Sequence, residues 1–368
     1  MQSIHVIIPV YNAKKYLQQA VDSVMEQPYK NIDIVLIDDG SIDESSLLCD
    51  RIAEQEDRVA VIHQENRGVS AARNTGIEYV LNNAKEDDYI AFVDADDLWV
   101  EKTITPSFMA DIRGQAADIV GLSTYHSNPT AKRFYISNKY ESCIIYKDKY
   151  NTKDMWPGGT FAAHLYRVSL FYNDALRFAE KSTHNEDIIF AVKAFFCAEK
   201  LMRTDKFLYI YRKNYTSVMN TTVYTPENAT KIPDAWYEAK IFATMCMDIS
   251  DGSRILWEKY CENVSAVRCL EFIRILAEQG YTYEAIQKCF ENKNYFYNLD
   301  ILDPDEFNTW QRQDLINYQK NKEVFCNSVV VSPTKRRLNQ LKHIRIFSSI
   351  AERFIYKLSA KDIKNENN

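Results

Sequence analysis

Residues 89–97 read YIAFVDADD, a short apolar run that ends in a group of aspartates. The run predicts a buried strand, because a strand covered on both faces of a sheet is apolar throughout. Alternation along such a strand would point Asp94 and Asp96 to the same face. Two adjacent carboxylates repel unless a cation or a donor shares their charge, and oxygen ligands of this kind suit Mg²⁺ or Mn²⁺. Taken alone, the stretch fits a metal site and the acidic start of a helix, with Asp97 as its cap, equally well.

Other apolar runs of strand length surround this one. They lie at residues 5–10, 32–37, 59–62 and 119–122. Amphipathic segments at residues 14–26 and 69–81 carry apolar residues at helical spacing. Alternation of strands and helices predicts an α/β fold, with a mostly parallel sheet flanked by helices.

Polar groups follow three of these runs. The first run leads into Tyr11 and Asn12, the second into DDGS at residues 38–41, and the run at 89–93 into DADD. Ligands of parallel sheets bind beyond the carboxyl ends of the strands. We therefore expect the three groups to meet at one edge of the sheet.

The composition limits the class of function. A net charge of −6 over 368 residues gives no overall basic footprint, so nucleic acid is not an expected partner. Eight cysteines without a CxxC pair predict reduced thiols. The sequence shows neither a signal-peptide pattern nor a run of 18 apolar residues. We therefore expect a cytoplasmic protein.

Four blocks in this order resemble the inverting family 2 glycosyltransferases of the GT-A fold, of the type that builds bacterial surface polysaccharides. The blocks are VIIPVYN (6–12), IDDGSID (37–43), NRGVSAARN (66–74) and FVDADDLW (92–99). A chance match to four blocks in this order is far less expected than a chance match to any one of them. Weaker matches continue through HLYR (164–167) and NED (185–187) and fade after about residue 220. The resemblance implies a GT-A (Rossmann-like) domain over residues 1–220, followed by a C-terminal helical accessory region over 221–368.

The resemblance also implies a donor site. Pro9, Tyr11 and Asp39 would border the nucleobase, and a carboxylate at the position of Asp39 can accept the imide N–H of uracil. Arg73 would lie near the donor and Asp94 near the ribose. The donor implied is a nucleotide-sugar, most simply a UDP-sugar.

Two further residues would carry the chemistry. Asp96 would be the principal carboxylate on Mn²⁺ or Mg²⁺, which neutralises charge on the departing nucleoside diphosphate. Asp187 would be the general base that takes the proton from an acceptor hydroxyl, with inversion at the anomeric carbon. The acceptor implied is a glycan or a lipid-linked saccharide.

Each of these residues also has a structural interpretation. DDGS at 38–41 fits an Asx turn, Arg73 fits a surface charge, and Asp187 fits an acid that favours a helix dipole. His164 and His184 fit structural histidines better than ligands. Trp156 fits a core residue as well as a platform for an acceptor sugar.

Other classes of protein are less consistent with the sequence. A sugar nucleotidyltransferase would show a Gly-rich basic loop after its first strand, and a dinucleotide-dependent oxidoreductase would show GxGxxG there. This chain has PVYNAK at residues 9–14. A non-catalytic module that binds a sugar nucleotide is the main alternative. It is disfavoured because Asp39, Asp94, Asp96 and Asp187 are all still carboxylates.

The tail at residues 335–358 is basic and amphipathic. Apolar residues recur there every three or four positions among lysines and arginines. Such a segment can lie on anionic lipid at the cytoplasmic face of a membrane, or it can pack on the protein with its charges solvated. The sequence leaves both interpretations open.

Overall fold

A computed structural model of the chain describes most of its residues. The described residues are 2–128, 133–147, 161–174, 176–180, 186–212, 225–226, 229–246, 252–291, 293–306 and 309–328. The chain divides into two compact units, residues 1–213 with 235–261, and residues 214–234 with 262–368. The division falls near the predicted boundary at residue 220 but returns 235–261 to the first unit, so the predicted boundaries stay a prediction.

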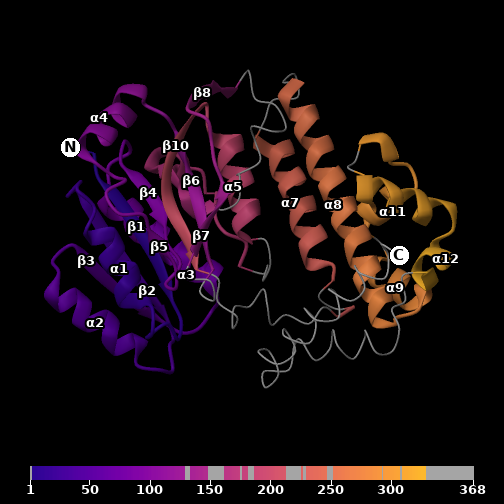
Figure 1. Cartoon of the computed structure of the whole chain (residues 1–368), viewed down its shortest axis with the longest axis horizontal. Coiled ribbons are helices and arrows are strands. Elements are labelled where there is room, and N and C mark those ends of the chain that lie inside the picture. Colours follow the sequence, from indigo (N-terminus) through magenta and orange to yellow (C-terminus); the bar gives the residue numbers. More distant parts are fainter. Residues whose placement is uncertain are drawn as a thin grey trace, which may run out of the picture. The chain divides into compact units, whose positions relative to one another are not determined.

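The first unit is built around one mixed sheet flanked by helices (Figure 1). The main strand order is β3-β2-β1-β4-β9-β6-β10-β5, with β7 added to β6 and β8 added to β10. The strands are β1 (Ile4–Val10), β2 (Ile32–Asp39), β3 (Val59–Gln64), β4 (Tyr89–Phe92), β5 (Leu98–Trp99), β6 (Ile119–Asn128), β7 (Arg133–Asn138), β8 (Cys143–Tyr146), β9 (His164–Arg167) and β10 (Lys200–Arg212). Six strands share one direction, namely β1, β2, β3, β4, β6 and β10.

Helices complete the first unit. Within residues 1–213 they are α1 (Leu17–Met25), α2 (Ser45–Gln55), α3 (Val69–Asn83), α4 (Pro106–Gln115) and α5 (Glu186–Cys197). Short 3₁₀ turns, η2 (Phe161–Ala163) and η3 (Val168–Tyr172), flank β9. The predicted α/β class with a mostly parallel sheet is confirmed. The strands predicted at residues 5–10, 32–37, 59–62, 89–93 and 119–122 correspond to β1, β2, β3, β4 and β6.

The described residues from 229 onward are mostly helical, as predicted. The helices are α7 (Lys231–Cys246), α8 (Gly252–Gln279), α9 (Tyr283–Phe290), α10 (Asn294–Asn298), α11 (Thr309–Lys320) and α12 (Lys322–Ser328), with a 3₁₀ turn η4 (Pro304–Glu306). Aromatic pairs hold the second unit together, Phe290 on Phe296 and Tyr318 against Phe325. Within the described residues, no helix combines the length and the apolar character needed to span a membrane.

One local prediction was wrong. Strand β4 ends at Phe92, and the aspartates that follow lie in a turn closed by the Asp97 N–H, which donates to the Asp94 carbonyl at 2.9 Å. Strand alternation therefore does not place the two acids. Asp97 does not cap a helix either, because the next helix begins at Pro106 and its cap is Thr105. Pro106 supplies a fixed φ at the first helical position, which is why α4 starts there and not earlier.

Helix α3 is held unusually close to β1, and this closeness positions the site residues on α3. The contact depends on Gly76, where an added Cβ would lie 2.5 Å from Cγ2 of Ile7. Ile7 is fully buried, so its side chain has no open space in which to move away.

We predict that Gly76→Ala lowers the free energy of unfolding by about 1–3 kcal/mol through overpacking. Gly114→Ala is the matched control, since an added Cβ there meets nothing within 4 Å. The control should gain about 0.5 kcal/mol from reduced chain entropy. Urea unfolding of the variants measures both effects, and a Gly76→Ala protein as stable as the wild type would contradict this packing.

Candidate functional site

The polar groups singled out in the sequence lie at one edge of the sheet. β1 is parallel to both β2 and β4, and Val10 lies beside Asp38 in the register. The carboxyl ends of these strands therefore meet, as predicted. The polar residues that follow β1, β2 and β4 can act on one ligand there.

The loops after β1 and β2 are tied to each other. The Asn12 side-chain oxygen accepts the N–H groups of Ile42 and Asp43, at 2.9 and 3.3 Å. Asp38 Oδ1 accepts the Ser41 N–H at 3.1 Å, which confirms the Asx-type turn. The two loops therefore form one fixed surface before any ligand arrives.

Asp39 organises the start of α3. Its carboxylate accepts the N–H groups of Arg67 and Gly68 at 2.9 and 2.8 Å and the side-chain amide of Gln64 at 2.7 Å. The neighbouring Gly40 has φ of 69°, and a Cβ there would lie 2.8 Å from the Asn66 nitrogen. Asp39 is buried and holds this loop, and its expected contact with a nucleobase stays a prediction.

Asp97 fastens the turn after β4 to the end of β10. Its carboxylate accepts the Tyr209 hydroxyl and the Arg212 backbone N–H, both at 2.6 Å. The Tyr209 oxygen in turn accepts the Asp94 N–H at 3.2 Å. Burial, together with the charges of Asp94 and Asp96, raises the pKa of Asp97 well above its usual range. Asp97 is therefore the structural member of the acidic turn.

Arg73 is buried inside the site and is not a surface charge. It is 3% exposed, and its guanidinium donates to Asp94 at 2.8 Å and to Glu186 at 3.2 Å. Burial alone would lower the pKa of Arg73, but the charges of Asp94 and Glu186 outweigh that effect and raise it. The side chain is therefore a permanent cation between two carboxylates.

Asp187 lies in the first turn of α5, next to Glu186. Its Oδ1 accepts the Ile188 N–H at 2.8 Å. Burial and the negative charge of Glu186 raise its pKa to about 6, while the positive charge of Arg73 acts in the opposite direction. A carboxylate with such a pKa is ionised at neutral pH and still has appreciable affinity for a proton.

The other predicted site residues lie along the same edge. Pro9 is buried near the end of β1, and Tyr11, which follows that strand, is 50% exposed. Asp96 is half-buried at the centre of the acidic turn. The structure therefore places five of the seven predicted residues at or just beyond the carboxyl ends of β1, β2 and β4, and the other two, Arg73 and Asp187, on helices α3 and α5. It does not test what each of them binds.

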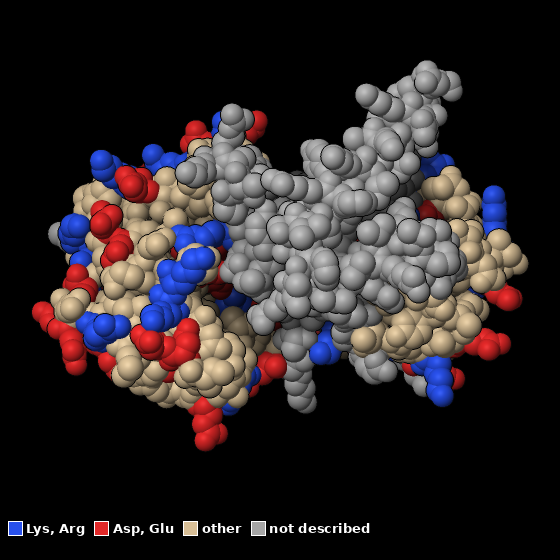
Figure 2. Space-filling model, turned by 60° about the horizontal axis from the view of Figure 1, so that its bottom comes forward, with Lys and Arg blue, Asp and Glu red and all other residues tan. Residues whose placement is uncertain are grey.

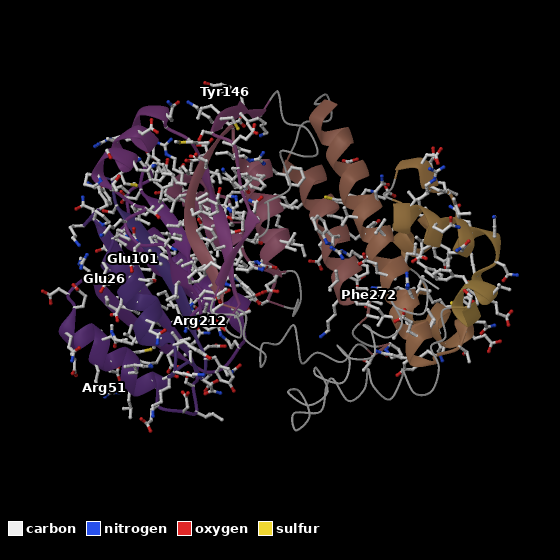
Figure 3. The ribbon with its side chains drawn as sticks, in the orientation of Figure 1. Glu26, Arg51, Glu101, Tyr146, Arg212 and Phe272 are labelled. Carbon is white, nitrogen blue, oxygen red and sulfur yellow. The ribbon has the colours of Figure 1, made fainter. Side chains whose placement is uncertain are left out.

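Two further residues complete this description, and one of them, His164, is also noted in the sequence. His164 is 2% exposed and packs against Phe195 and Tyr166, which agrees with a structural histidine. Arg212, labelled in Figure 3, ends β10 with its guanidinium over the Tyr16 ring. Trp156, His184, Asn185 and the tail at 335–358 lie outside the described residues.

Several contributors to the site carried no signal in the sequence. Glu186 belongs to the NED match, but nothing in the sequence indicates that it pairs with Arg73 across 113 positions of the chain. Tyr209 bridges Asp94 and Asp97, and Phe161 and Phe178 support Arg73. Such contacts join distant segments, and only the folded chain brings them together.

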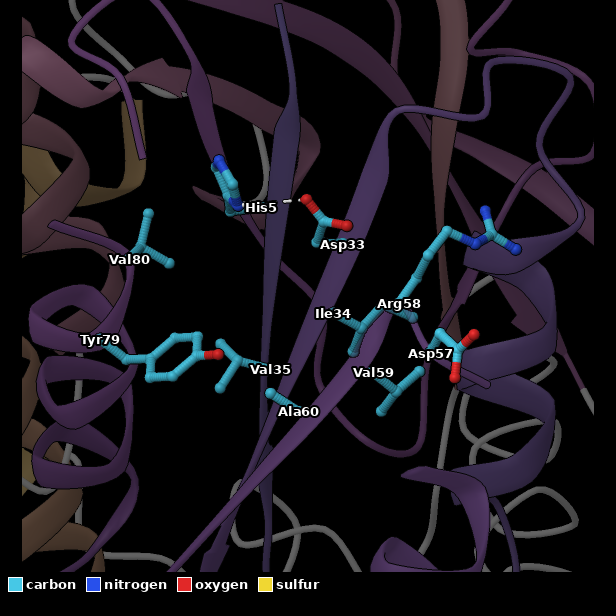
Figure 4. Close-up of a pocket in the computed structure, with 10 residues that line it drawn as sticks. All are labelled: His5, Asp33, Ile34, Val35, Asp57, Arg58, Val59, Ala60, Tyr79 and Val80. Carbon is cyan, nitrogen blue, oxygen red and sulfur yellow. Dashed lines mark ion pairs between the residues drawn. The ribbon is translucent and has the colours of Figure 1, made fainter. Parts of the chain in front are cut away.

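A pocket lies at the edge of the sheet opposite the candidate site (Figure 4). It is lined by His5, Asp33 and Val59, which lie at the amino ends of β1, β2 and β3, and by Tyr79 of α3. His5 pairs with Asp33 at 3.7 Å. None of the predicted site residues lines this pocket. On the face shown in Figure 2, acidic and basic side chains are interspersed over the described surface, without an extended field of one sign.

Residues 5–173 match the family described as Glycosyl transferase family 2. The matched region contains all four sequence blocks. Two curated relatives come from Streptococcus pneumoniae. The chain is 36% identical to glycosyltransferase GlyA over 219 residues, which is 57% of this chain and 30% of GlyA. It is 30% identical to glycosyltransferase GlyG over 233 residues, which is 59% of this chain and 73% of GlyG. The chain therefore spans less than a third of GlyA.

A solved structure is similar over almost the whole chain. The crystal structure of residues 1–349 of TarS from S. aureus, in complex with UDP-GlcNAc, has a TM-score of 0.57 at 18% sequence identity. The likeness covers 97% of this chain and 92% of that chain. At this low identity it shows the fold alone, and it confirms the predicted GT-A fold.

His63 gives the site edge a dependence on pH. Its two ring nitrogens lie 2.9 Å from Asp38 and 2.9 Å from Asp50. Hydrogen bonds to these two carboxylates raise the pKa of His63. A histidine with a raised pKa stabilises the fold below its unfolded pKa of about 6.5, and this contribution is lost as pH rises through the folded pKa.

We therefore predict that His63→Gln is destabilising at pH 6 and that the difference from the wild type shrinks as the pH rises. Urea unfolding at a series of pH values measures this difference. A difference that stays constant, or that grows with pH, would show that His63 is not held as a cation.

Proposed function

The chain belongs to glycosyltransferase family 2, and from that premise we propose that it transfers a sugar from a UDP-sugar to a glycan or lipid-linked saccharide acceptor, with inversion. The reaction is of the kind that extends bacterial surface polysaccharides. The single observation that carries the proposal is the placement of Asp187. This carboxylate has a raised pKa and lies in the same charged cluster as Arg73 and Asp94, at the edge where the four family blocks meet.

The chemistry follows from that placement. Asp187 accepts the proton of an acceptor hydroxyl as the oxygen attacks the anomeric carbon. The new glycosidic bond forms as the bond to the nucleoside diphosphate breaks, and the electron pair leaves with the diphosphate. Attack from the face opposite the leaving group inverts the configuration. A single base is sufficient, and no covalent sugar intermediate is required.

A divalent cation fits the acidic turn. The turn carries three carboxylates, and the charges of Asp94 and Asp96 add to burial in raising the pKa of Asp97. Carboxylate oxygen atoms suit Mg²⁺ or Mn²⁺. Asp96 would hold the ion, which when bound offsets the charge that develops on the departing diphosphate. Among the described residues no group of three His, Cys, Asp or Glu side chains forms a ready metal cage. The proposed site relies on phosphate oxygens and water for the remaining ligands.

The UDP moiety is supported by the fixed surface formed by Tyr11, Asp39 and the loops around them. TarS, which shares the fold, was crystallised with UDP-GlcNAc. Exposed Tyr11 offers a ring for stacking against a base. The acceptor class and contact of the tail at 335–358 with the cytoplasmic face of a membrane remain part of the proposal.

The main alternative is a non-catalytic module that binds a sugar nucleotide. Asp187 separates the two, because a raised pKa next to a buried cation serves proton transfer and adds nothing to binding a nucleotide. We predict that the wild-type protein releases UDP from at least one UDP-sugar when acceptor and Mn²⁺ are present. Binding without release under these conditions would favour the module.

We predict that Asp187→Asn lowers kcat by about 100-fold or more, because removal of a general base costs 10²–10⁴ in rate. Binding of UDP, measured by calorimetry, should be unchanged. Asp111→Asn is the control, since this aspartate is exposed and lies on α4, a helix that carries none of the predicted residues. Full turnover by Asp187→Asn would remove Asp187 from the mechanism.

The pH dependence of the wild type gives a separate test. The base must be ionised, so kcat/KM should fall as pH drops through about 6, the pKa to which burial and Glu186 raise Asp187. A rate profile recorded at constant metal measures this limb. A profile that stays flat down to pH 5 would contradict a base with a raised pKa.

A further inference from the structure

Arg73 joins the two halves of the candidate site. It projects from α3, and its guanidinium donates to Asp94 Oδ1 at 2.8 Å and to Glu186 Oε1 at 3.2 Å. Asp94 belongs to the turn expected to face the donor, and Glu186 opens the helix that carries Asp187. One planar group therefore connects the donor side of the site with the base.

Aromatic rings fix this group in place. The guanidinium carbon lies 4.6 Å from the centroid of the Phe161 ring and 5.1 Å from that of Phe178. Phe178 stacks on Phe190 of α5, with centroids 4.0 Å apart and the rings within 8° of parallel. Arg73 therefore holds α5 through the ion pair with Glu186 and again through this stack.

The geometry leaves Arg73 poorly suited to bind a phosphate. Both terminal nitrogens already donate to carboxylates, and the buried Nε has no hydrogen-bond partner among the residues that the structure describes. An unpaired buried N–H is costly, and an arginine bound to phosphate would normally present two parallel N–H groups. Here the two terminal nitrogens donate to two different acids instead, and the guanidinium lies against the Phe161 and Phe178 rings.

We propose that Arg73 is a positioning residue which, together with Glu186, holds the amino end of α5 so that Asp187 is in place beside the donor turn before substrate binds. The inference rests on the proposed function, since it concerns the same base. In this proposal Arg73 positions the base, Asp187, and does not bind the donor. A base held by packed and paired neighbours loses little freedom in the transition state.

A positioning role for Arg73 and Glu186 predicts changes in the pH dependence of the rate that a general loss of structure would not cause. The groups that interact electrostatically with Asp187 are Glu186 on its own helix, Arg73 on α3, Asp94 after β4 and the buried hydroxyl of Tyr166 on β9. Glu186 favours the protonated form of Asp187, and Arg73 favours the ionised form. Neutralising either residue should therefore move the acidic limb of the rate profile, in opposite directions.

The test compares Glu186→Gln, Arg73→Gln and Arg73→Lys in the full chain, with a UDP-sugar, acceptor and saturating Mn²⁺. We expect Glu186→Gln to lower kcat by about tenfold, part of the 10²–10⁴ that a base contributes, with donor KM and UDP binding near wild type. Its acidic limb should shift to lower pH, and that of Arg73→Gln to higher pH. Arg73→Lys should restore the limb but not kcat, because an ammonium group cannot span both carboxylates or lie flat on the rings.

Glu78→Gln is the matched control. Glu78 lies on the same helix as Arg73 and pairs with Arg177 at 2.8 Å, away from the acidic turn. This variant should keep the wild-type kcat and limb. If Arg73→Gln does not fold, Glu186→Gln and Arg73→Lys still decide the question.

Two results would overturn the positioning role while leaving the proposed function intact. One is a Glu186→Gln enzyme with wild-type kcat and an unmoved limb. The other is weaker UDP binding by both Arg73 variants with no change in the limb, which would assign Arg73 to the donor. Absence of transfer by the wild-type protein would overturn both proposals together.

Discussion

The arrangement of the site depends on one buried positive charge. Arg73 is 3% exposed, yet it lies among the carboxylates of Asp94, Glu186 and Asp187. A buried charge is tolerated only when it is paired, and breaking such a pair costs several kcal/mol. The pairing fixes where α3, the turn after β4 and the start of α5 lie relative to one another. It also leaves the cluster with more negative than positive charge, which suits a site that takes up a cation.

The parallel register of the sheet explains why these groups meet. The strands β1, β2, β3, β4, β6 and β10 all end at the same edge, so residues from separate segments converge there. Local contacts then divide the work among the acids. Asp38 and Asp39 hold loops and Asp97 fastens β10, while the proposed chemistry assigns the metal to Asp96 and the proton transfer to Asp187. Most of the aspartates at this edge of the sheet therefore have structural roles, and the proposed sugar transfer requires few of them.

Sequence patterns predicted the sheet well because apolar runs of strand length are a local signal. They also indicated the edge on which the site lies. They failed at residues 94–97, where a turn replaces the expected strand, and at Asp97, whose partners Tyr209 and Arg212 are more than 100 positions away. They also left Arg73 open as a surface charge, since its burial depends on Phe161, Phe178 and Glu186. Contacts between distant segments decide such questions, and no local pattern encodes them.

The central claim is that one carboxylate base acts at this edge and that the sugar moves in a single displacement. The stereochemistry of the product tests this most directly. With a UDP-sugar whose anomeric bond is α, proton NMR of the product should show the large anomeric coupling of a β-linked gluco-configured sugar. An α-linked product would mean retention of configuration and would contradict the account, whatever the rate of transfer.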